Sequence, residues 1–110
     1  MEFEVRGRNL NLSESMEELV ERRIDFALGR FSGEIRRIDV QLSDLGDTHD
    51  GVAKQCRVSV TLQHGGRVRA EGTDEQLRDA IDQAVYRVGR RLGRKLDRSV
   101  HPRRSFRLAS

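Results

Sequence analysis

The sequence predicts an α+β domain with the element order β-α-β-β-β-α, in which two helices pack on one face of a four-stranded sheet. Two observations predict this class. Four segments alternate apolar and polar residues, and two longer segments repeat apolar residues at helical spacing. Because each strand is apolar on one side, both helices should cover the same face of an antiparallel-rich sheet and leave the other face open.

The first strand and the first helix account for the N-terminal part of the chain. Residues 2–6 alternate charged and apolar side chains, which predicts a strand with one buried face. Ser13 is the expected N-cap of a helix over about 14–30, and Ser15 with Glu18 is a second candidate. The helical spacing is carried by Met16, Leu19, Val20, Ile24, Ala27, Leu28 and Phe31.

Three further strands are predicted in the middle of the chain. Residues 38–42, 56–62 and 68–70 again alternate apolar and polar side chains. Gly65-Gly66 is a hairpin signal that should join the last two of these strands. The segment 44–53 is expected to be an exposed loop.

A long second helix is predicted from Thr73 or Asp74, one of which would cap it, to about residue 97. At about 1.5 Å per residue it is longer than a small sheet, so its C-terminal turns should project. The segment 99–110 is expected to be a flexible basic tail after a domain of residues 1–98. The helical spacing is carried by Leu77, Ala80, Ile81, Ala84, Val85, Val88, Leu92 and Leu96.

The composition fits one small cytoplasmic domain. The chain has 110 residues, of which 35% are hydrophobic and 35% are charged, and this length allows a modest core without metals or disulfides. No segment has the roughly 18 apolar residues that cross a bilayer, and the N-terminus lacks the apolar stretch of a signal peptide. Cys56, the single cysteine, falls on the apolar side of a strand and should be buried.

Charge is spread unevenly along the chain. Residues 1–86 carry 12 Lys and Arg against 17 Asp and Glu, whereas residues 87–110 carry 9 against a single acid, Asp97. The two parts therefore have net charges of −5 and +8. Clustered arginines suit phosphate recognition, because a guanidinium group binds two phosphate oxygens at once. An anionic membrane surface could use the same cluster.

The second helix gathers its basic residues into one stripe. At about 100° per residue, five arginines fall within about 100° of each other, with acids on the opposite flank. Lys95 falls near the apolar centre, where its amine would have to extend outward. A solvated face is the plain alternative, but Arg87 with Arg91 and Arg90 with Arg94 are like-charge neighbours that an anionic partner would relieve.

The open sheet face adds further arginines, mixed with acidic residues. The candidate RNA-binding residues are Arg87, Arg90, Arg91, Arg94, Lys95 and Arg98 of the second helix, with Arg6, Arg8, Arg67 and Arg69 of the sheet. Gly89 and Gly93 fall on the expected exposed side of the helix. They could allow the backbone of a partner to approach closely, or they could reflect neutral drift on a tolerant surface, and the sequence does not decide between these explanations. The few aromatic residues argue against single-stranded readout and favour recognition of folded RNA by shape and phosphate.

No residue pattern supports catalysis. The cluster Asp47-Thr48-His49-Asp50 lacks a second His or Cys ligand nearby, so we expect no metal. Cys56 and the serines lack the surroundings of an activated nucleophile, and no glycine-rich phosphate loop is followed by Lys. We expect no enzyme activity, no cofactor and no small-molecule substrate.

Several short motifs stand in a characteristic order along the chain. They are Gly7, Asn9 and Ser13, then Ile38-Asp39-Val40-Gln41-Leu42, then Glu71-Gly72, Leu77 and Ala80-Ile81-Asp82, and finally Arg87, Arg90, Arg94 and Arg98. In this order, over about residues 1–98, they resemble the ribosome hibernation promoting factor family, which includes ribosome-associated inhibitor A. The chain departs from the family pattern at Arg78, where an aromatic residue is usual, and in the segment 44–53.

The resemblance implies a short-form member that lodges in the small ribosomal subunit between head and body. There it would lie against ribosomal RNA where messenger and transfer RNA sit, and would block translation and store idle ribosomes under stress and in stationary phase. Its partners would be the small subunit and the intact ribosome, with a monomer off the ribosome, no membrane partner and no chemical step.

Two alternatives stay open from the residues. A double-stranded RNA-binding module also packs two helices on one face of a sheet, although the strand before the first helix argues against it. A regulator that docks an acidic protein through the basic helix is the other.

Overall fold

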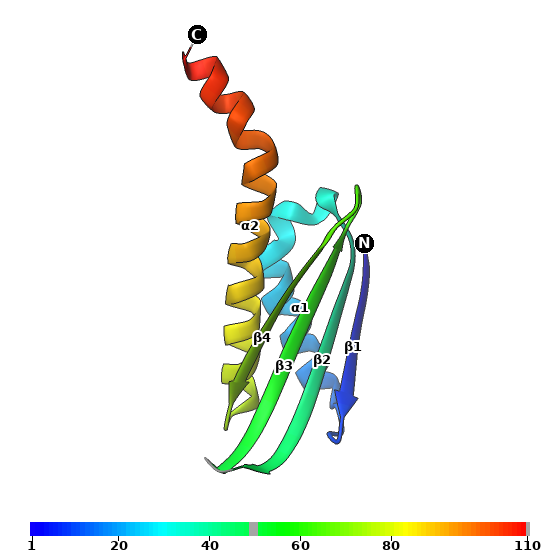
Figure 1. The fold of residues 1–110 in the computed structure, drawn as a ribbon. Helices are drawn as coiled ribbons and strands as arrows, with labels where there is room; N and C mark the ends of the chain where they lie inside the picture. Colours follow the sequence, from blue (N-terminus) through cyan, green and yellow to red (C-terminus); the bar gives the residue numbers. More distant parts are fainter. Residues whose placement is uncertain (49–50, 110) are drawn as a thin grey trace.

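The computed structural model describes residues 1–48 and 51–109 of the chain. It has the predicted element order, with strands β1 (Glu2–Arg8), β2 (Ile35–Thr48), β3 (Gly51–Leu62) and β4 (Arg67–Asp74), and helices α1 (Glu14–Leu28) and α2 (Leu77–Ala109). A 3-10 helix, Gly29–Glu34, connects α1 to β2. Figure 1 shows the sheet as one layer and the helices as the other, which confirms the α+β fold class.

The four strands form one sheet in the order β1-β2-β3-β4. β1 pairs in parallel with β2, and the other neighbours are antiparallel. The register aligns apolar residues in rows across the sheet, because the side chains of residues paired across neighbouring strands lie on the same side of the sheet. One row is Phe3, Ile38, Val60 and Val68, and the next is Val5, Val40, Val58 and Ala70.

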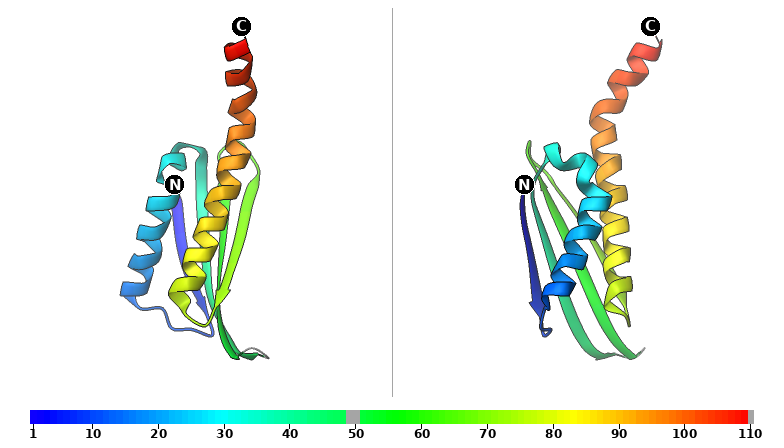
Figure 2. Two further views of the ribbon diagram at one scale, coloured as in Figure 1. Left: turned by 90° about the vertical axis from the view of Figure 1, so that its left-hand side faces the viewer. Right: turned by 180° about the vertical axis from the view of Figure 1, so that it is seen from behind.

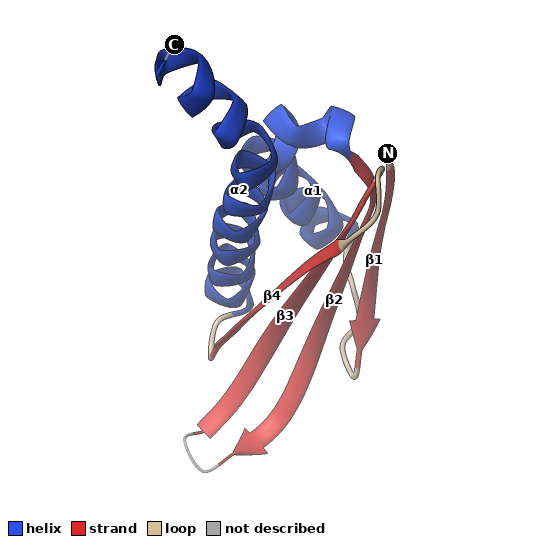
Figure 3. Ribbon diagram, turned by 45° about the horizontal axis from the view of Figure 1, so that its top comes forward, coloured by secondary structure: helices blue, strands red, loops and turns tan. Residues whose placement is uncertain are grey.

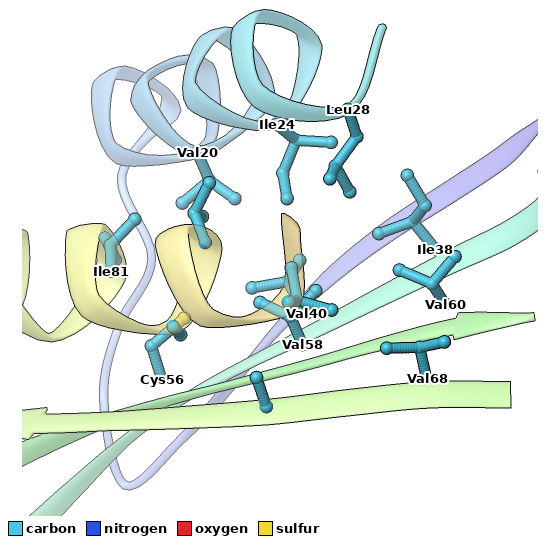
Figure 4. Close-up of a cluster of buried hydrophobic side chains, with 14 of the residues drawn as sticks. Val20, Ile24, Leu28, Ile38, Val40, Cys56, Val58, Val60, Val68 and Ile81 are labelled. Carbon is cyan, nitrogen blue, oxygen red and sulfur yellow. The ribbon is translucent and has the colours of Figure 1, made fainter. Parts of the chain in front are cut away.

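Both helices cover the apolar face of this sheet. Figure 2 shows α1 and α2 side by side, and Figure 3 shows that the opposite face carries no helix. The core between the layers takes Val20, Ile24 and Leu28 from α1 and Ala80, Ile81, Ala84, Val88 and Leu92 from α2. Cys56 lies in the same core (Figure 4), fully buried as predicted.

Helix α1 begins where the sequence predicts. The Ser13 hydroxyl oxygen accepts a hydrogen bond from the Met16 backbone N–H at 3.1 Å, so Ser13 is the N-cap. The helix ends at Leu28, slightly before the predicted end near residue 30. The chain then tightens into the 3-10 helix before it enters β2.

The predicted exposed loop over 44–53 is wrong. β2 and β3 continue through this segment as a long hairpin, with Gly46 opposite Ala53 and Thr48 opposite Gly51. An irregularity between Asp44 and Gly46 interrupts the alternation of side chains, and this hides the strand from the pattern of the sequence. Residues 49 and 50 lie outside the described part.

An ion pair fastens this part of the hairpin. The Lys54 amine lies 2.8 Å from Asp44 Oδ2, and the Gly46 backbone N–H donates to Asp44 Oδ1 at 2.8 Å. The hydrogen bond from Lys54, and then that from Gly46, lower the pKa of the Asp44 carboxyl.

Both ends of α2 differ from the sequence prediction. The helix begins at Leu77, later than a cap at Thr73 or Asp74 would place it, and Asp74 accepts a hydrogen bond from the Gln76 backbone N–H at 3.1 Å in the turn before the helix. The helix continues to Ala109, well past the predicted end near residue 97. Its last turns project beyond the sheet as expected, and the molecule measures 58 × 29 × 21 Å (Figure 1). The flexibility of the segment 99–110 stays a prediction.

The described part of the chain holds no helix that is long and apolar enough to cross a membrane.

Candidate nucleic-acid interface

Helix α2 lies directly against the edge strand β4, because one glycine of that strand lets the two backbones approach. A Cβ on Gly72 would lie 2.2 Å from the Ala80 carbonyl oxygen and 2.8 Å from the Ala84 nitrogen. No larger residue fits at this position without displacing the helix. Gly72 therefore sets where the basic stripe of α2 meets the sheet.

Two arginines of the stripe bind the outer backbone of β4. Arg87 donates from Nη1 to the Glu71 carbonyl oxygen at 2.7 Å, and Arg91 donates to the carbonyl oxygen of Arg69. Since β4 is the last strand of the sheet, these carbonyl groups have no neighbouring strand to bind. The stripe is thereby held along the edge of the sheet.

Basic side chains from β4 and α2 converge in one groove at this edge. The edge groove is lined by Arg67, Val68 and Arg69 of β4 and by Arg91, Arg94 and Lys95 of α2. The Lys95 amine extends to the hairpin between β3 and β4, where it lies 3.0 Å from the position of a Cβ on Gly66. This is the outward extension of the lysine amine that the sequence predicts. A second hollow, lined by Arg69, Ala70, Glu71, Arg87 and Arg91, continues along the same edge.

On the open sheet face near β1, Arg6 and Arg37 are paired with acidic side chains, unlike the basic residues of the edge groove. Arg37 contacts Glu2 at 2.7 Å, Glu4 at 2.5 Å and Asp39 at 2.9 Å. These hydrogen bonds, that of Asp39 first, raise the pKa of the Arg37 guanidinium. Arg6 lies 3.4 Å from Glu4 and 3.8 Å from Asp39. The β1–β2 side of the face therefore neutralises its own charge.

The edge groove keeps its positive charge. Among the residues that the structure describes, Arg67, Arg69, Arg94 and Lys95 form no ion pair, and their nearest charged neighbours in the groove are basic. Arg57, in the centre of the sheet, is paired with Glu71 at 3.4 Å. Unpaired guanidinium groups held on two rigid elements are what phosphate binding requires.

The structure divides the ten candidate residues into groups. Five of them, Arg67, Arg69, Arg91, Arg94 and Lys95, meet in the edge groove, and Arg87 lies beside it. Arg6 and Arg8 are on β1 at the other edge of the sheet, and Arg6 lines a wide hollow of the open sheet face together with Arg67 and Arg69. Arg90 does not line the groove but contacts Tyr86, and the side chain of Arg98 lies outside the described part.

The sequence predicts Gly89 and Gly93 on the exposed side of α2, but the structure does not place them there. Gly93 is buried and Gly89 is half-buried, and both face the N-terminal helix region. A Cβ on Gly89 would lie 3.7 Å from Leu28, and one on Gly93 would lie 3.8 Å from Phe31. The expectation is wrong because α1 covers this flank of α2, which the helical pattern of α2 does not reveal.

Two aromatic residues without a role predicted from the sequence are exposed in the structure. Phe26 of α1 is 95% exposed and Tyr86 of α2 is 63% exposed. Both fall off the apolar phase of their helices, which is the signal that could have found them. Phe3 and Phe31, in contrast, pack partly buried against the core as predicted.

The remaining reactive residues form no site among the residues described. Burial raises the pKa of the Cys56 thiol to about 12, which makes it unreactive. No group of three His, Cys, Asp or Glu residues in the described part is placed to hold a metal ion. His49 and Asp50, of the cluster considered in the sequence, lie outside that part.

Comparison with known proteins identifies one family. Residues 3–100 match the model of the sigma 54 modulation protein / S30EA ribosomal protein family. The chain is 30% identical over 96 residues to the ribosome-binding factor PSRP1, chloroplastic, of Spinacia oleracea. This match covers 86% of the chain but 32% of the relative, so the chain spans about a third of that protein's length.

Two solved structures share the fold. The N-terminal domain of Protein Y from Thermus thermophilus has a TM-score of 0.69 and 30% identity, over 82% of this chain and 92% of that one. A ribosomal subunit interface protein from Coxiella burnetii has a TM-score of 0.72 at 17% identity, over 86% of this chain and 97% of the other. The second likeness shows the fold alone.

Proposed function

Since this chain belongs to the sigma 54 modulation protein / S30EA ribosomal protein family, we propose that it is a ribosome-associated factor of the cytoplasm that inhibits translation. It binds the small ribosomal subunit, alone and in the intact ribosome, through ribosomal RNA phosphates. It occludes the sites of messenger and transfer RNA and thereby stabilises idle ribosomes. The mechanism is steric, with no chemical step.

The observation that carries this proposal is the edge groove. Arg67 and Arg69 of one element and Arg94 and Lys95 of another present four positive groups on one surface, without acidic partners among the described residues. Such an array neutralises neighbouring phosphates and releases their counterions, which drives binding at moderate salt. Its rigid backing by the sheet and α2 suits a structured RNA better than a flexible acidic tail.

One relative supports the same partner. The spinach relative, 30% identical over 96 residues, is named a ribosome-binding factor. The described part of this chain contains the fold that the two solved structures share, with the basic edge on its surface.

Co-sedimentation with small subunits and intact ribosomes over a salt series tests the proposal. We expect saturable binding by the wild type and its loss in the double variant Arg69→Glu/Arg94→Glu, which reverses two charges of the edge groove. The matched control is Arg36→Glu/Arg78→Glu, because both side chains are exposed, lie outside the groove and have no ion pair in the described part. Equal loss in both variants would show that net charge alone drives binding.

The same preparation separates the alternatives. Absence of ribosome binding by the wild type even at low salt would overturn the proposal. Tighter binding to an RNA duplex than to ribosomes would favour a double-stranded RNA-binding module. Binding to acidic protein in place of either RNA would favour a protein-docking regulator.

A further inference from the structure

Two aromatic rings stand in solvent on the helix layer, one from each helix. Phe26 of α1 is 95% exposed and Tyr86 of α2 is 63% exposed. A single exposed apolar side chain on a protein surface is ordinary. These two rings differ from such isolated side chains because they lie at the same level of two neighbouring helices and have arginines nearby.

The rings come from the same level of the helix layer. On the N-terminal side of the two rings, the helices contact each other through Arg23 Nε of α1, which lies 3.2 Å from Asp82 Oδ1 of α2. On the C-terminal side, Leu28 of α1 lies 3.7 Å from the position of a Cβ on Gly89 of α2. Phe26 and Tyr86 each fall between these two contacts in sequence, and Figure 2 shows the two helices side by side over this stretch.

After Tyr86, the flank of α2 toward α1 carries glycines, whereas Asp82 before it reaches Arg23 of α1. Gly89 and Gly93 occupy the flank that faces the N-terminal helix region, where Leu28 and Phe31 are the nearest side chains. Gly89, three residues after Tyr86, therefore adds no side chain to that flank.

An arginine contacts the Tyr86 ring, and two arginines lie near Phe26 in the sequence. The Arg90 guanidinium lies 5.8 Å from the centre of the Tyr86 ring and donates to the Tyr86 hydroxyl oxygen at 3.2 Å. Arg22 precedes Phe26 by one helical turn, and Arg30 follows it by four residues and stacks on Phe31 at 4.5 Å. Within the described residues, Arg22, Arg30 and Arg90 have no acidic partner.

The small number of aromatic residues argues against single-stranded readout in the sequence, but the structure exposes two of them on the helix layer. We propose that Phe26 and Tyr86, flanked by Arg22, Arg30 and Arg90, form a stacking site for unpaired nucleotides of RNA. Exposed rings take up base faces whatever the sequence, and guanidinium groups stack on bases and neutralise the adjoining phosphates. The edge groove, in contrast, offers charge without rings and suits the phosphates of paired RNA. The inference rests on the proposed function in taking RNA as the partner, and it adds a second class of RNA element on a different surface.

The chain contains its own probe for this site. Tyr86 is the single tyrosine and the chain has no tryptophan, so intrinsic fluorescence reports on Tyr86 alone. The probes are a non-self-complementary RNA strand of about 12 nucleotides and the same strand annealed to its complement. We expect saturable quenching by the single strand and none by the duplex.

Two variants separate the surfaces. Phe26→Leu keeps an apolar side chain but removes the ring, and we expect it to weaken single-strand binding about tenfold while duplex binding, followed by anisotropy of labelled RNA, stays unchanged. Arg67→Gln/Arg69→Gln should weaken duplex binding and leave the quenching of Tyr86 unchanged. Urea unfolding of each variant checks that the fold is retained.

The outcomes distinguish this inference from the proposed function. Wild-type binding of the single strand by Phe26→Leu, or binding without quenching, would overturn the stacking site even if ribosomes co-sediment normally. Quenching by poly-glutamate but not by RNA would overturn it in favour of an acidic protein partner. Quenching by the single strand in a protein that does not bind ribosomes would support the site while the proposed function fails.

Discussion

Arg87 donates a hydrogen bond from its guanidinium to the backbone carbonyl oxygen of Glu71, over a distance of 2.7 Å. One turn further along α2, Arg91 binds the carbonyl oxygen of Arg69 in the same way. Two members of the basic stripe are thus committed to the backbone of an edge strand. They occupy backbone carbonyl groups of an edge strand that could otherwise pair with another chain. Of the α2 residues that line the groove, Arg94 and Lys95 are then left without an ion pair or such a backbone contact in the described part.

The bound and unbound arginines should differ in their effect on stability. We expect Arg87→Ala and Arg91→Ala each to lower the free energy of unfolding by about 0.5–1.5 kcal/mol, because each removes a hydrogen bond to a backbone carbonyl group. Arg94 has no ion-pair partner in the described part, so Arg94→Ala should change the free energy of unfolding by less than about 0.5 kcal/mol. Urea unfolding followed by circular dichroism measures these values. Equal effects at all three positions would contradict the edge-binding role.

The salt dependence of RNA binding should reveal which arginines touch phosphate. Arg69→Gln should reduce the slope of log K against log salt by about 0.9, since one phosphate contact is lost. Arg6→Gln should leave the slope unchanged, because Arg6 is already paired with Glu4 and Asp39. Titration of labelled RNA at several salt concentrations gives both slopes. A reduced slope for Arg6→Gln would place RNA on the β1 side of the sheet as well.

Gly72 should tolerate no side chain. Gly72→Ala places a Cβ 2.2 Å from the Ala80 carbonyl oxygen, and such overpacking costs about 1–3 kcal/mol or more. The matched control is Gly29→Ala, where nothing lies within 4 Å and the backbone is already helical. This control should gain about 0.4–1 kcal/mol, because alanine has fewer unfolded conformations than glycine. Thermal and urea unfolding of the two variants compare them directly, and a neutral Gly72→Ala would mean that α2 can shift.

Replacing Gly89 or Gly93 of α2 with alanine should raise stability, in contrast to Gly72→Ala. A Cβ on Gly89 or Gly93 would make ordinary contacts at 3.7 and 3.8 Å. Each change to alanine should therefore stabilise the helix by up to about 1 kcal/mol through its higher helix propensity. Lower stability in both variants, measured by urea unfolding, would show that α1 and α2 are packed more tightly than these distances indicate.

Cys56 should link stability to alkaline pH. Burial raises the pKa of its thiol to about 12 in the folded chain, against 9.0 when exposed. The folded state therefore holds its proton where the unfolded state has lost it, so the contribution is present below pH 9.0 and is lost as the pH rises toward 12. We expect the wild type to lose stability over this range more steeply than Cys56→Ala. Thiol labelling at neutral pH should proceed only through unfolding, and rapid labelling of the native protein would contradict this.

The order of the elements and most of the core follow from local patterns in the sequence. Alternation in residues 2–6, 38–42, 56–62 and 68–70 and helical spacing in two segments are local properties, and they select one buried face for each element. The Gly65-Gly66 turn and the Ser13 cap are equally local, because their geometry depends on a few neighbouring residues. The basic stripe of α2 was visible for the same reason.

Tertiary structure decided the rest, because contacts between distant residues are absent from any periodic pattern. Pairing with β3 carries β2 through the segment expected to be a loop, since an irregular strand can still complete its backbone hydrogen bonds with a partner. Packing of α1 on α2 buries Gly93, which the pattern of α2 placed in solvent. The sheet register gives Arg6 its acidic partners, whereas the approach of α2 at Gly72 joins Arg67 and Arg69 to Arg94 and Lys95. Composition supplied the charges, and only the fold decided which of them neutralise one another and which stay free for a partner.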